Sequence, residues 1–326
     1  MIALVSVGTP LLWAVFLGIV FVLLALDLGV FHRKAHEIRT REALLWSAFW
    51  IGISLAFNGW IFLRFGAASG TQFLTAYLLE KALSVDNLFV FMLLLAHFSV
   101  PAQVQHRVLY WGILGALITR AAFIIGGIAL IQMFHWILYL FGAFLVFTGI
   151  KILAMKEKEE EEIQENRIVR FFRKIVRMTP DYEGTSFFVR RGGLLFATPL
   201  LLVLVAIETT DVAFATDSIP AVFGVSQDPF IVFTSNIFAV LGLRALYFAL
   251  AAVMRKFQYL NVGLGLVLSF IGIKMLVDKW VDRWVRERYG DRSDVVQAVA
   301  SLAVIAVILA VAMLASVARK SPEAKS

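Results

Sequence analysis

The sequence contains no cysteine and few charged residues. Asp, Glu, Lys and Arg make up 16% of its 326 residues, whereas 60% are hydrophobic and the mean hydropathy is +0.84. Soluble globular proteins have roughly 25% charged residues, so we expect lipid to be the solvent for much of this chain. The absence of cysteine excludes disulfide bonds, thiolate metal sites and a cysteine nucleophile.

Basic residues exceed acidic residues and give a formal net charge of +7. They lie between apolar runs and form no basic stripe with interleaved aromatic residues, so we expect no nucleic-acid partner. Loop charges that orient a membrane protein explain the excess better. The first apolar run, residues 11–26, has no Lys or Arg before it and no small-residue cleavage site. We interpret it as a retained membrane span rather than a signal peptide.

Apolar runs long enough to cross a lipid bilayer, which takes about 20 residues, occur about nine times. We place these spans at residues 10–31, 44–63, 72–97, 108–131, 134–153, 194–213, 230–251, 259–277 and 295–317. The sequence therefore predicts an all-α polytopic membrane protein with about nine transmembrane helices.

The distribution of Lys and Arg predicts the orientation of these spans. With the amino terminus outside, the inner segments hold 19 Lys and Arg residues and the outer segments hold 6, so we expect the carboxyl terminus in the cytoplasm. Five of the six outer residues lie in 278–294, which we interpret as an interfacial amphipathic segment with tryptophans at 280 and 284. Residues 154–193 are expected to be a charged cytoplasmic linker, partly a solvated helix and partly flexible.

Two parts of the chain resemble each other. EKALSVDN at 80–87 aligns acid over acid with DVAFATDS at 211–218, and FTGIKIL at 147–153 aligns with FIGIKML at 270–276. Between these matches, an Arg-Ala pair recurs in the same order. Each unit has three expected spans, so the two copies should lie inverted in the membrane, as in many secondary transporters. The expected divisions are 1–71 (spans 1–2), 72–153 (repeat 1), 194–277 (repeat 2) and 295–326 (last span and tail).

Six acidic residues fall within the expected spans, where a carboxylate is costly unless it has a partner or a function. Three basic residues, Lys81, Arg120 and Arg244, oppose them. If all nine are ionised, three negative charges remain, and protons or bound cations can balance them. The acids are Asp27, Glu80, Asp86, Glu208, Asp211 and Asp217.

Helical spacing places polar residues on one face of a helix in each repeat. These residues are Glu80, Ser84 and Asn87 in the first repeat, and Glu208, Asp211 and Ser218 in the second. Asp86 and Asp217 fall about 120° away on a straight helix. Because Pro220 cannot donate to the carbonyl of Thr216, we expect a kink that frees an oxygen ligand beside Asp217.

The chemistry of these residues is that of carboxylate, amide and hydroxyl oxygens. Such ligands suit Mg²⁺, Ca²⁺ and Mn²⁺, whereas thiolate and imidazole sites suit Zn²⁺ and copper. The five histidines lie at expected span ends or in loops and are expected at the surface. We therefore expect a divalent cation as substrate and no required cofactor.

Three stretches carry a family resemblance: LALDLGVFHR around Asp27, AYLLEKALSVDNLFVF, and IETTDVAFATDSIPAVF. They resemble the TerC family, in particular its Alx-like branch, within the wider LysE-type exporter group. The resemblance covers about residues 10–280 and implies a bacterial inner-membrane protein associated with manganese efflux. The family also carries an older label of tellurium resistance. The metal-binding positions that the resemblance implies are Glu80, Asp86, Asn87, Asp211, Asp217 and Ser218, with Asp27 as an additional member.

These observations favour an exporter of divalent metal cations, with Mn²⁺ as the expected substrate, that works by alternating access and exchanges metal for protons. No GxxxxGK[ST] loop is present, so an ion gradient or the membrane potential must supply the energy. A second hypothesis is a non-transporting membrane partner for metal delivery or tellurite resistance. A third is an intramembrane enzyme. It is less favoured because HExxH and GxSxG are absent and only Asp86 and Asp217 resemble an aspartyl-protease pair. The residues indicate no oligomeric state.

Overall fold

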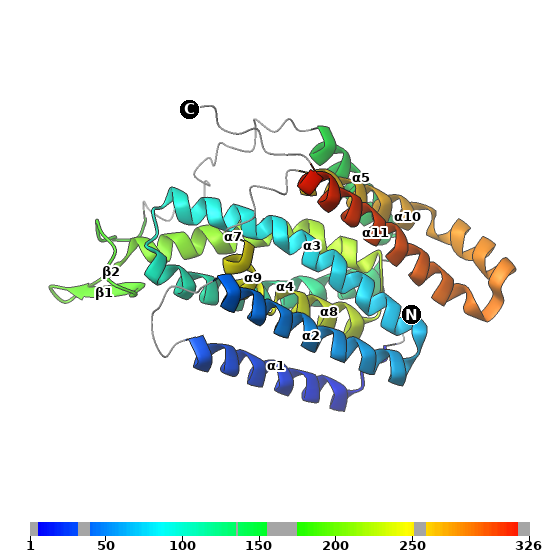
Figure 1. The fold of residues 1–326 in the computed structure, drawn as a ribbon, viewed down its shortest axis with the longest axis horizontal. Helices are drawn as coiled ribbons and strands as arrows, with labels where there is room; N and C mark the ends of the chain where they lie inside the picture. The colour runs from blue at the N-terminus through cyan, green and yellow to red at the C-terminus, as the bar shows by residue number, and fades with distance from the viewer. Residues whose placement is uncertain (1–5, 32–39, 135, 155–174, 251–258, 319–326) are drawn as a thin grey trace.

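A computed structural model describes residues 6–31, 40–134, 136–154, 175–250 and 259–318. Within these residues the chain forms a bundle of α-helices and one small β-hairpin (Figure 1). The elements are α1 (Pro10–Phe31), α2 (Thr40–Phe65), α3 (Ala67–His97), α4 (Ala102–Met133), α5 (Ile137–Ala154), β1 (Phe188–Arg191), β2 (Leu194–Ala197), α7 (Pro199–Phe223), α8 (Pro229–Val240), α9 (Leu243–Leu250), α10 (Leu260–Tyr289) and α11 (Ser293–Ala318).

Six helical segments of the described chain are long and apolar enough to cross a membrane. They are Arg41–Phe65, Gln103–Met133, Ile137–Ala154, Pro199–Phe223, Pro229–Ala249 and Ser293–Ser316. The expected spans in α1, α3 and α10 are helical but are not among these six. The predicted α-helical class is thus confirmed apart from the small hairpin, and several helices are apolar enough to span a membrane, while the number of nine spans stays a prediction.

The helix α3 lies inside the bundle, where it packs against α2, α7, α8 and α11 (Figure 1). Its middle carries Glu80, Lys81 and Asp86, which lowers its hydropathy below that of a lipid-facing span. Because other helices surround α3, its charged middle is placed against protein rather than lipid. An aromatic core that includes Phe57 and Phe238 joins α1, α2, α3 and α8.

The helices α5 and α10 pack closely through glycines. A Cβ atom at Gly149 would lie 2.6 Å from the carbonyl oxygen of Gly265, and a Cβ at Gly272 would lie 2.6 Å from that of Gly142. The contact positions rise along one helix as they fall along the other, so the two helices are antiparallel. Only glycine permits this approach of the two backbones.

Two expected spans differ from the helices in the structure. The span placed at 194–213 instead runs from Pro199 to Phe223, because residues 194–197 form β2. The span placed at 230–251 is divided into α8 and α9 at Gly242, whose φ of +82° lies in the left-handed region. Pro220 lies within α7, which continues through this residue to Phe223, so the expected kink does not end the helix.

The described part of the linker is more ordered than the sequence predicted. Residues 188–197 form an antiparallel hairpin, and Thr185 accepts a 2.6 Å hydrogen bond from Arg107 at the start of α4. The Tyr182 hydroxyl donates to the carbonyl oxygen of Phe98 at 2.6 Å, and burial raises the pKa of this phenol, so it remains a donor at neutral pH. Residues 155–174, which contain the charged run, lie outside the described residues.

The segment 278–294 also differs from the prediction of a separate interfacial element. Its first twelve residues continue α10 to Tyr289, and a short turn then leads into α11 at Ser293. Trp280 and Trp284 are 84% and 63% exposed, as expected of residues that contact lipid or its interface. The end of α10 and the start of α11 lie at the opposite end of the molecule from the β-hairpin (Figure 1).

Candidate cation site

The polar faces predicted on α3 and α7 are buried between helices. Glu80 and Ser84 are fully buried, Asn87 is 4% exposed, and Asp211 and Ser218 are 3% and 1% exposed. This grouping follows from the helical repeat, because residues separated by four and seven positions lie on one side of a helix. The faces meet neighbouring helices, since α3 packs against α7 and α8 and α7 packs against α4.

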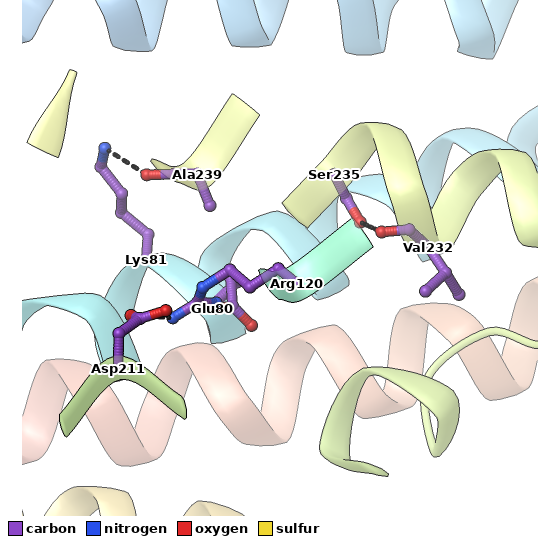
Figure 2. Close-up of polar contacts among 7 residues, drawn as sticks. All are labelled: Glu80, Lys81, Arg120, Asp211, Val232, Ser235 and Ala239. Atoms are coloured by element: carbon purple, nitrogen blue, oxygen red, sulfur yellow. Dashed lines mark hydrogen bonds and ion pairs between the residues drawn. The ribbon is translucent and has the colours of Figure 1, made fainter. Parts of the chain in front are cut away.

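The buried Arg120 of α4 lies between two of these acids, one from each repeat (Figure 2). Its guanidinium forms an ion pair with Glu80 of α3 and a second ion pair with Asp211 of α7, the latter at 3.2 Å. Two carboxylates and one guanidinium give this cluster a formal charge of −1. The expectation that Arg120 is a buried counter-charge for acids is confirmed.

Lys81 contacts a different part of the molecule from Glu80. Its Nζ donates to the carbonyl oxygen of Ala239 at 3.1 Å, near the end of α8 (Figure 2). The break at Gly242 leaves carbonyl groups at this helix end without a continuing helix, and a cation there also complements the helix dipole. Lys81 therefore stabilises the end of α8, while Arg120 alone bridges Glu80 and Asp211 among the described ion pairs.

Several buried polar atoms of α3, α7 and α8 have no hydrogen-bond partner in the structure, and neither has Nε of Arg120. They are Glu80 Oε2, Ser84 Oγ, Asn87 Nδ2, Asp211 Oδ2, Ser218 Oγ, and both side-chain polar atoms of Asn236. Buried polar atoms are normally paired, and leaving one unpaired costs roughly 1–3 kcal/mol. Carboxylate, hydroxyl and amide oxygens are among these atoms, and they are the types of ligand that hard divalent cations accept.

The structure does not place three of the predicted site residues in this cluster. Asp217 lies away from it, and the side chains of Asp86 and Asp27 are not among those described. Asp217 is half-buried and accepts a long 3.5 Å hydrogen bond from Thr148 of α5. Among the side chains that are described, no group of three or more His, Asp or Glu residues has the spacing of a metal site. The structure thus brings together Glu80 and Asp211 and places Asp217 toward α5.

Glu208 packs against a glycine of the neighbouring helix α4. A Cβ atom at Gly115 would overlap the Glu208 carboxylate, so the absence of a side chain at Gly115 provides the space for this group. Glu208 lies three residues before Asp211 on the same face of α7. No cationic partner for it occurs among the described ion pairs.

Sequence reasoning missed Asn236 and the contact between Lys81 and Ala239. Asn236 is fully buried in α8, although both its amide atoms are unpaired. A signal for it exists, because an amide within an otherwise apolar span usually finds a polar partner. The contact with Ala239 had no such signal, because it depends on where α8 ends.

A cavity of about 370 Å³ lies apart from these residues, toward the end of the bundle where α10 meets α11. Its lining includes Gln72 of α3, Lys274 and Asp278 of α10, and Asp294 of α11. None of the predicted site residues lines it. The cavity is polar and opens at the molecular surface, but it is not the place where the acids of the two repeats meet.

Comparisons with known proteins identify the family. The family model described as integral membrane protein TerC family matches residues 65–324. Alx of Escherichia coli (strain K12), whose name proposes a membrane-bound redox modulator, is 50% identical over 83% of this chain and 87% of its own length. The uncharacterized membrane protein STKORF319 of Myxococcus xanthus is 50% identical over 85% of this chain and 86% of its own. No solved structure matches. This chain therefore belongs to the TerC family of integral membrane proteins.

Proposed function

We propose that this protein exports divalent metal cations, with Mn²⁺ as its substrate, from the cytoplasm across the bacterial inner membrane. The observation that carries the proposal is the buried cluster in which Glu80 and Asp211 share Arg120. Each acid keeps one carboxylate oxygen without a hydrogen-bond partner. A buried net charge of −1, with an unpaired oxygen on each acid, favours the entry of a cation.

The ligand chemistry supports a hard cation. The described side chains supply carboxylate, hydroxyl and amide groups from Glu80, Asp211, Ser84, Ser218 and Asn87. Mn²⁺, Mg²⁺ and Ca²⁺ all accept such ligands, while the absence of cysteine excludes the thiolate sites that softer metals prefer. Asp86, Asp217 and Asp27 remain proposed members of the site.

Alternating access of two inverted repeats is the proposed mechanism. Gly142 and Gly149 of α5 are followed 123 residues later by Gly265 and Gly272 of α10, at the same spacing as the FTGIKIL and FIGIKML matches. In the structure Gly142 contacts Gly272, and Gly149 contacts Gly265. Exchanging the two repeats converts one contact into the other, which supports a two-fold relation between antiparallel units.

A role in redox chemistry, which the name of the relatives proposes, has no support in the residues of this chain. With no cysteine, the protein cannot exchange thiols and disulfides through its own side chains. An enzymatic role is not proposed either, because Asp217 contacts Thr148 of α5 and no catalytic motif is present. Membrane-bound metal delivery without transport is the alternative that the transport assay below separates.

The test is metal uptake into proteoliposomes that contain the purified full chain. Uptake of Mn²⁺ should exceed that of Mg²⁺, Ca²⁺ and Zn²⁺, and an imposed pH gradient should accelerate it, as metal–proton exchange requires. Asp217→Asn and Asp86→Asn should reduce Mn²⁺ binding and uptake to near background, because each removes a charge from a poorly hydrated site. Both substitutions keep the size of the side chain and its capacity for hydrogen bonds.

Glu183→Gln is the matched control. It also removes one carboxylate, but from an exposed ion pair with Arg191 on the hairpin, so uptake should equal that of the parent. Binding of Mn²⁺ without any uptake would favour the metal-delivery alternative. Parent-like binding and uptake in both Asp variants would exclude Asp86 and Asp217 from the site, and parent-like behaviour of Glu80→Gln and Asp211→Asn as well would overturn the proposal.

A further inference from the structure

Asn236 of α8 is an exception among its neighbours. Thr234, Ser235 and Asn236 are all fully buried, and the two hydroxyls donate to carbonyl groups of their own helix. Thr234 donates to Phe230 at 2.7 Å, and Ser235 donates to Val232 at 3.2 Å (Figure 2). By contrast, neither amide atom of Asn236 has a partner, so exchanging its oxygen and nitrogen leaves it equally unpaired.

The position of Asn236 along α8 relates it to the acids of α3. Ala239 accepts the hydrogen bond from Lys81, which directly follows Glu80 in α3 (Figure 2). The helix α8 packs against α3 and α4, the helices that carry Glu80 and Arg120, and Asn236 is fully buried there, three residues before Ala239. The two residues are separated by about 4.5 Å along the helix axis. Asn236 therefore lies about one helical turn along α8 from the carbonyl that Lys81, the neighbour of Glu80, contacts.

We infer that Asn236 supplies a neutral oxygen ligand to the transported cation, in addition to the acids of α3 and α7. The inference rests on the proposed function and names a ligand from a third helix. An amide carbonyl oxygen is an ordinary ligand of hard divalent cations. It adds coordination without adding negative charge to a cluster that already contains two carboxylates. A bound cation would also give the buried amide oxygen the partner that it lacks.

The experiment compares the parent with Asn236→Leu and Ser235→Ala, using the full chain. One measurement is the rise in unfolding temperature that Mn²⁺ produces in detergent, and the other is the KM for Mn²⁺ uptake in proteoliposomes. Asn236→Leu has a similar volume but no polar atom, so KM should rise about tenfold or more and the Mn²⁺-dependent shift should be lost. Ser235→Ala removes a hydroxyl bonded only to its own helix, so both measurements should equal those of the parent.

A purely structural asparagine gives a different result. Asn236→Leu would then unfold at a higher temperature without metal, because an unpaired amide is replaced by an apolar side chain, and KM would equal that of the parent. That outcome overturns the inference.

Asn236→Asp, which retains an oxygen at the same position, provides a second test if Asn236→Leu fails to accumulate. It should bind Mn²⁺ at least as tightly as the parent, and loss of binding in this folded variant would contradict a ligand role. A parent protein that neither binds nor transports Mn²⁺ would instead overturn the proposed function itself.

Discussion

At the scale of single residues, each charge of the Glu80–Arg120–Asp211 cluster would be costly to bury without its partners. An isolated buried charge is costly, and removing one partner of a buried ion pair typically destabilises a protein by about 3–5 kcal/mol. Arg120 and Glu80 are fully buried, so water cannot replace a missing partner. The cluster therefore persists because each charge offsets the burial of another. Under the proposed function, a cation that enters must compete with the guanidinium.

Gly115 provides a prediction at this scale. A Cβ atom at position 115 would overlap the Glu208 carboxylate, so in Gly115→Ala either this carboxylate moves or α4 and α7 separate. Overpacking of this kind costs about 1–3 kcal/mol, and we expect a lower unfolding temperature together with slower Mn²⁺ uptake. Gly126→Ala on the same helix has no atom within 4 Å of the added Cβ and should match the parent. Equal behaviour of the two variants would show that the space at Gly115 has no role.

The sequence predicted the acids and their shared faces but not their partners. Helical spacing alone places Glu80 with Ser84 and Asn87, and the structure buries all three. Which base meets which acid depends on the packing of helices distant in the chain, since Arg120 is 40 residues from Glu80 and 91 from Asp211. No local pattern contains that information, so the pairing could be expected only in general terms.

At the scale of elements, the division between α8 and α9 follows from one glycine. Gly242 has a φ of +82°, and a Cβ there would lie 2.6 Å from the Trp50 side chain of α2. The sequence could not single out this position, because other glycines, such as Gly149, instead permit close helix packing. Pro220 illustrates the opposite case. It is a residue type that often kinks or breaks helices, yet it lies within the continuous α7.

The start of α8 gives a prediction for a single element. Asp228 caps the helix by accepting from the backbone N–H groups of Phe230 at 2.8 Å and Ile231 at 3.2 Å. It also accepts from Val7 and Ser6, which connects the segment before α1 to α8. Asp228→Ala should lower the free energy of unfolding by about 1–2 kcal/mol or more, measured by thermal unfolding in detergent.

Asp228→Asn is the control for this helix cap. Asparagine caps helices about as well as aspartate, so most of the stability should be retained. A loss as large as that of the alanine variant would show that the second carboxylate oxygen, which accepts from Val7 N–H, or the charge stabilises this region more than the cap does.

At the scale of the whole molecule, the orientation in the membrane is the prediction that connects the fold to export. The β-hairpin and the α10–α11 turn lie at opposite ends of the molecule (Figure 1), and the distribution of Lys and Arg predicts that the hairpin is cytoplasmic. Since the chain has no cysteine, Arg190→Cys and Arg288→Cys each introduce a single exposed thiol. In intact spheroplasts, a membrane-impermeant maleimide should label position 288 alone, and lysis should expose position 190.

Labelling of both positions from one side would contradict the inverted arrangement of the repeats. Labelling of position 190 but not 288 in intact spheroplasts would keep the repeats inverted relative to each other. It would place the hairpin outside, so the proposed direction of transport would be reversed. The two results are distinguishable because each variant carries its own thiol and the parent supplies a background without any.

A fixed cation in the site also changes how the electrical work of transport is divided between the two halves of the cycle. With Arg120 between them, Glu80 and Asp211 together carry a formal charge of −1 rather than −2. A divalent cation changes this sum to +1, so the empty and loaded clusters have equal charge of opposite sign. Carrying one elementary charge through the membrane potential corresponds to about 2.3 kcal/mol per 100 mV. Arg120 leaves the net charge moved per cycle unchanged, because the transported ions set that charge. Under the proposed mechanism, Arg120 instead brings the unprotonated empty cluster and the loaded cluster to one unit of charge each.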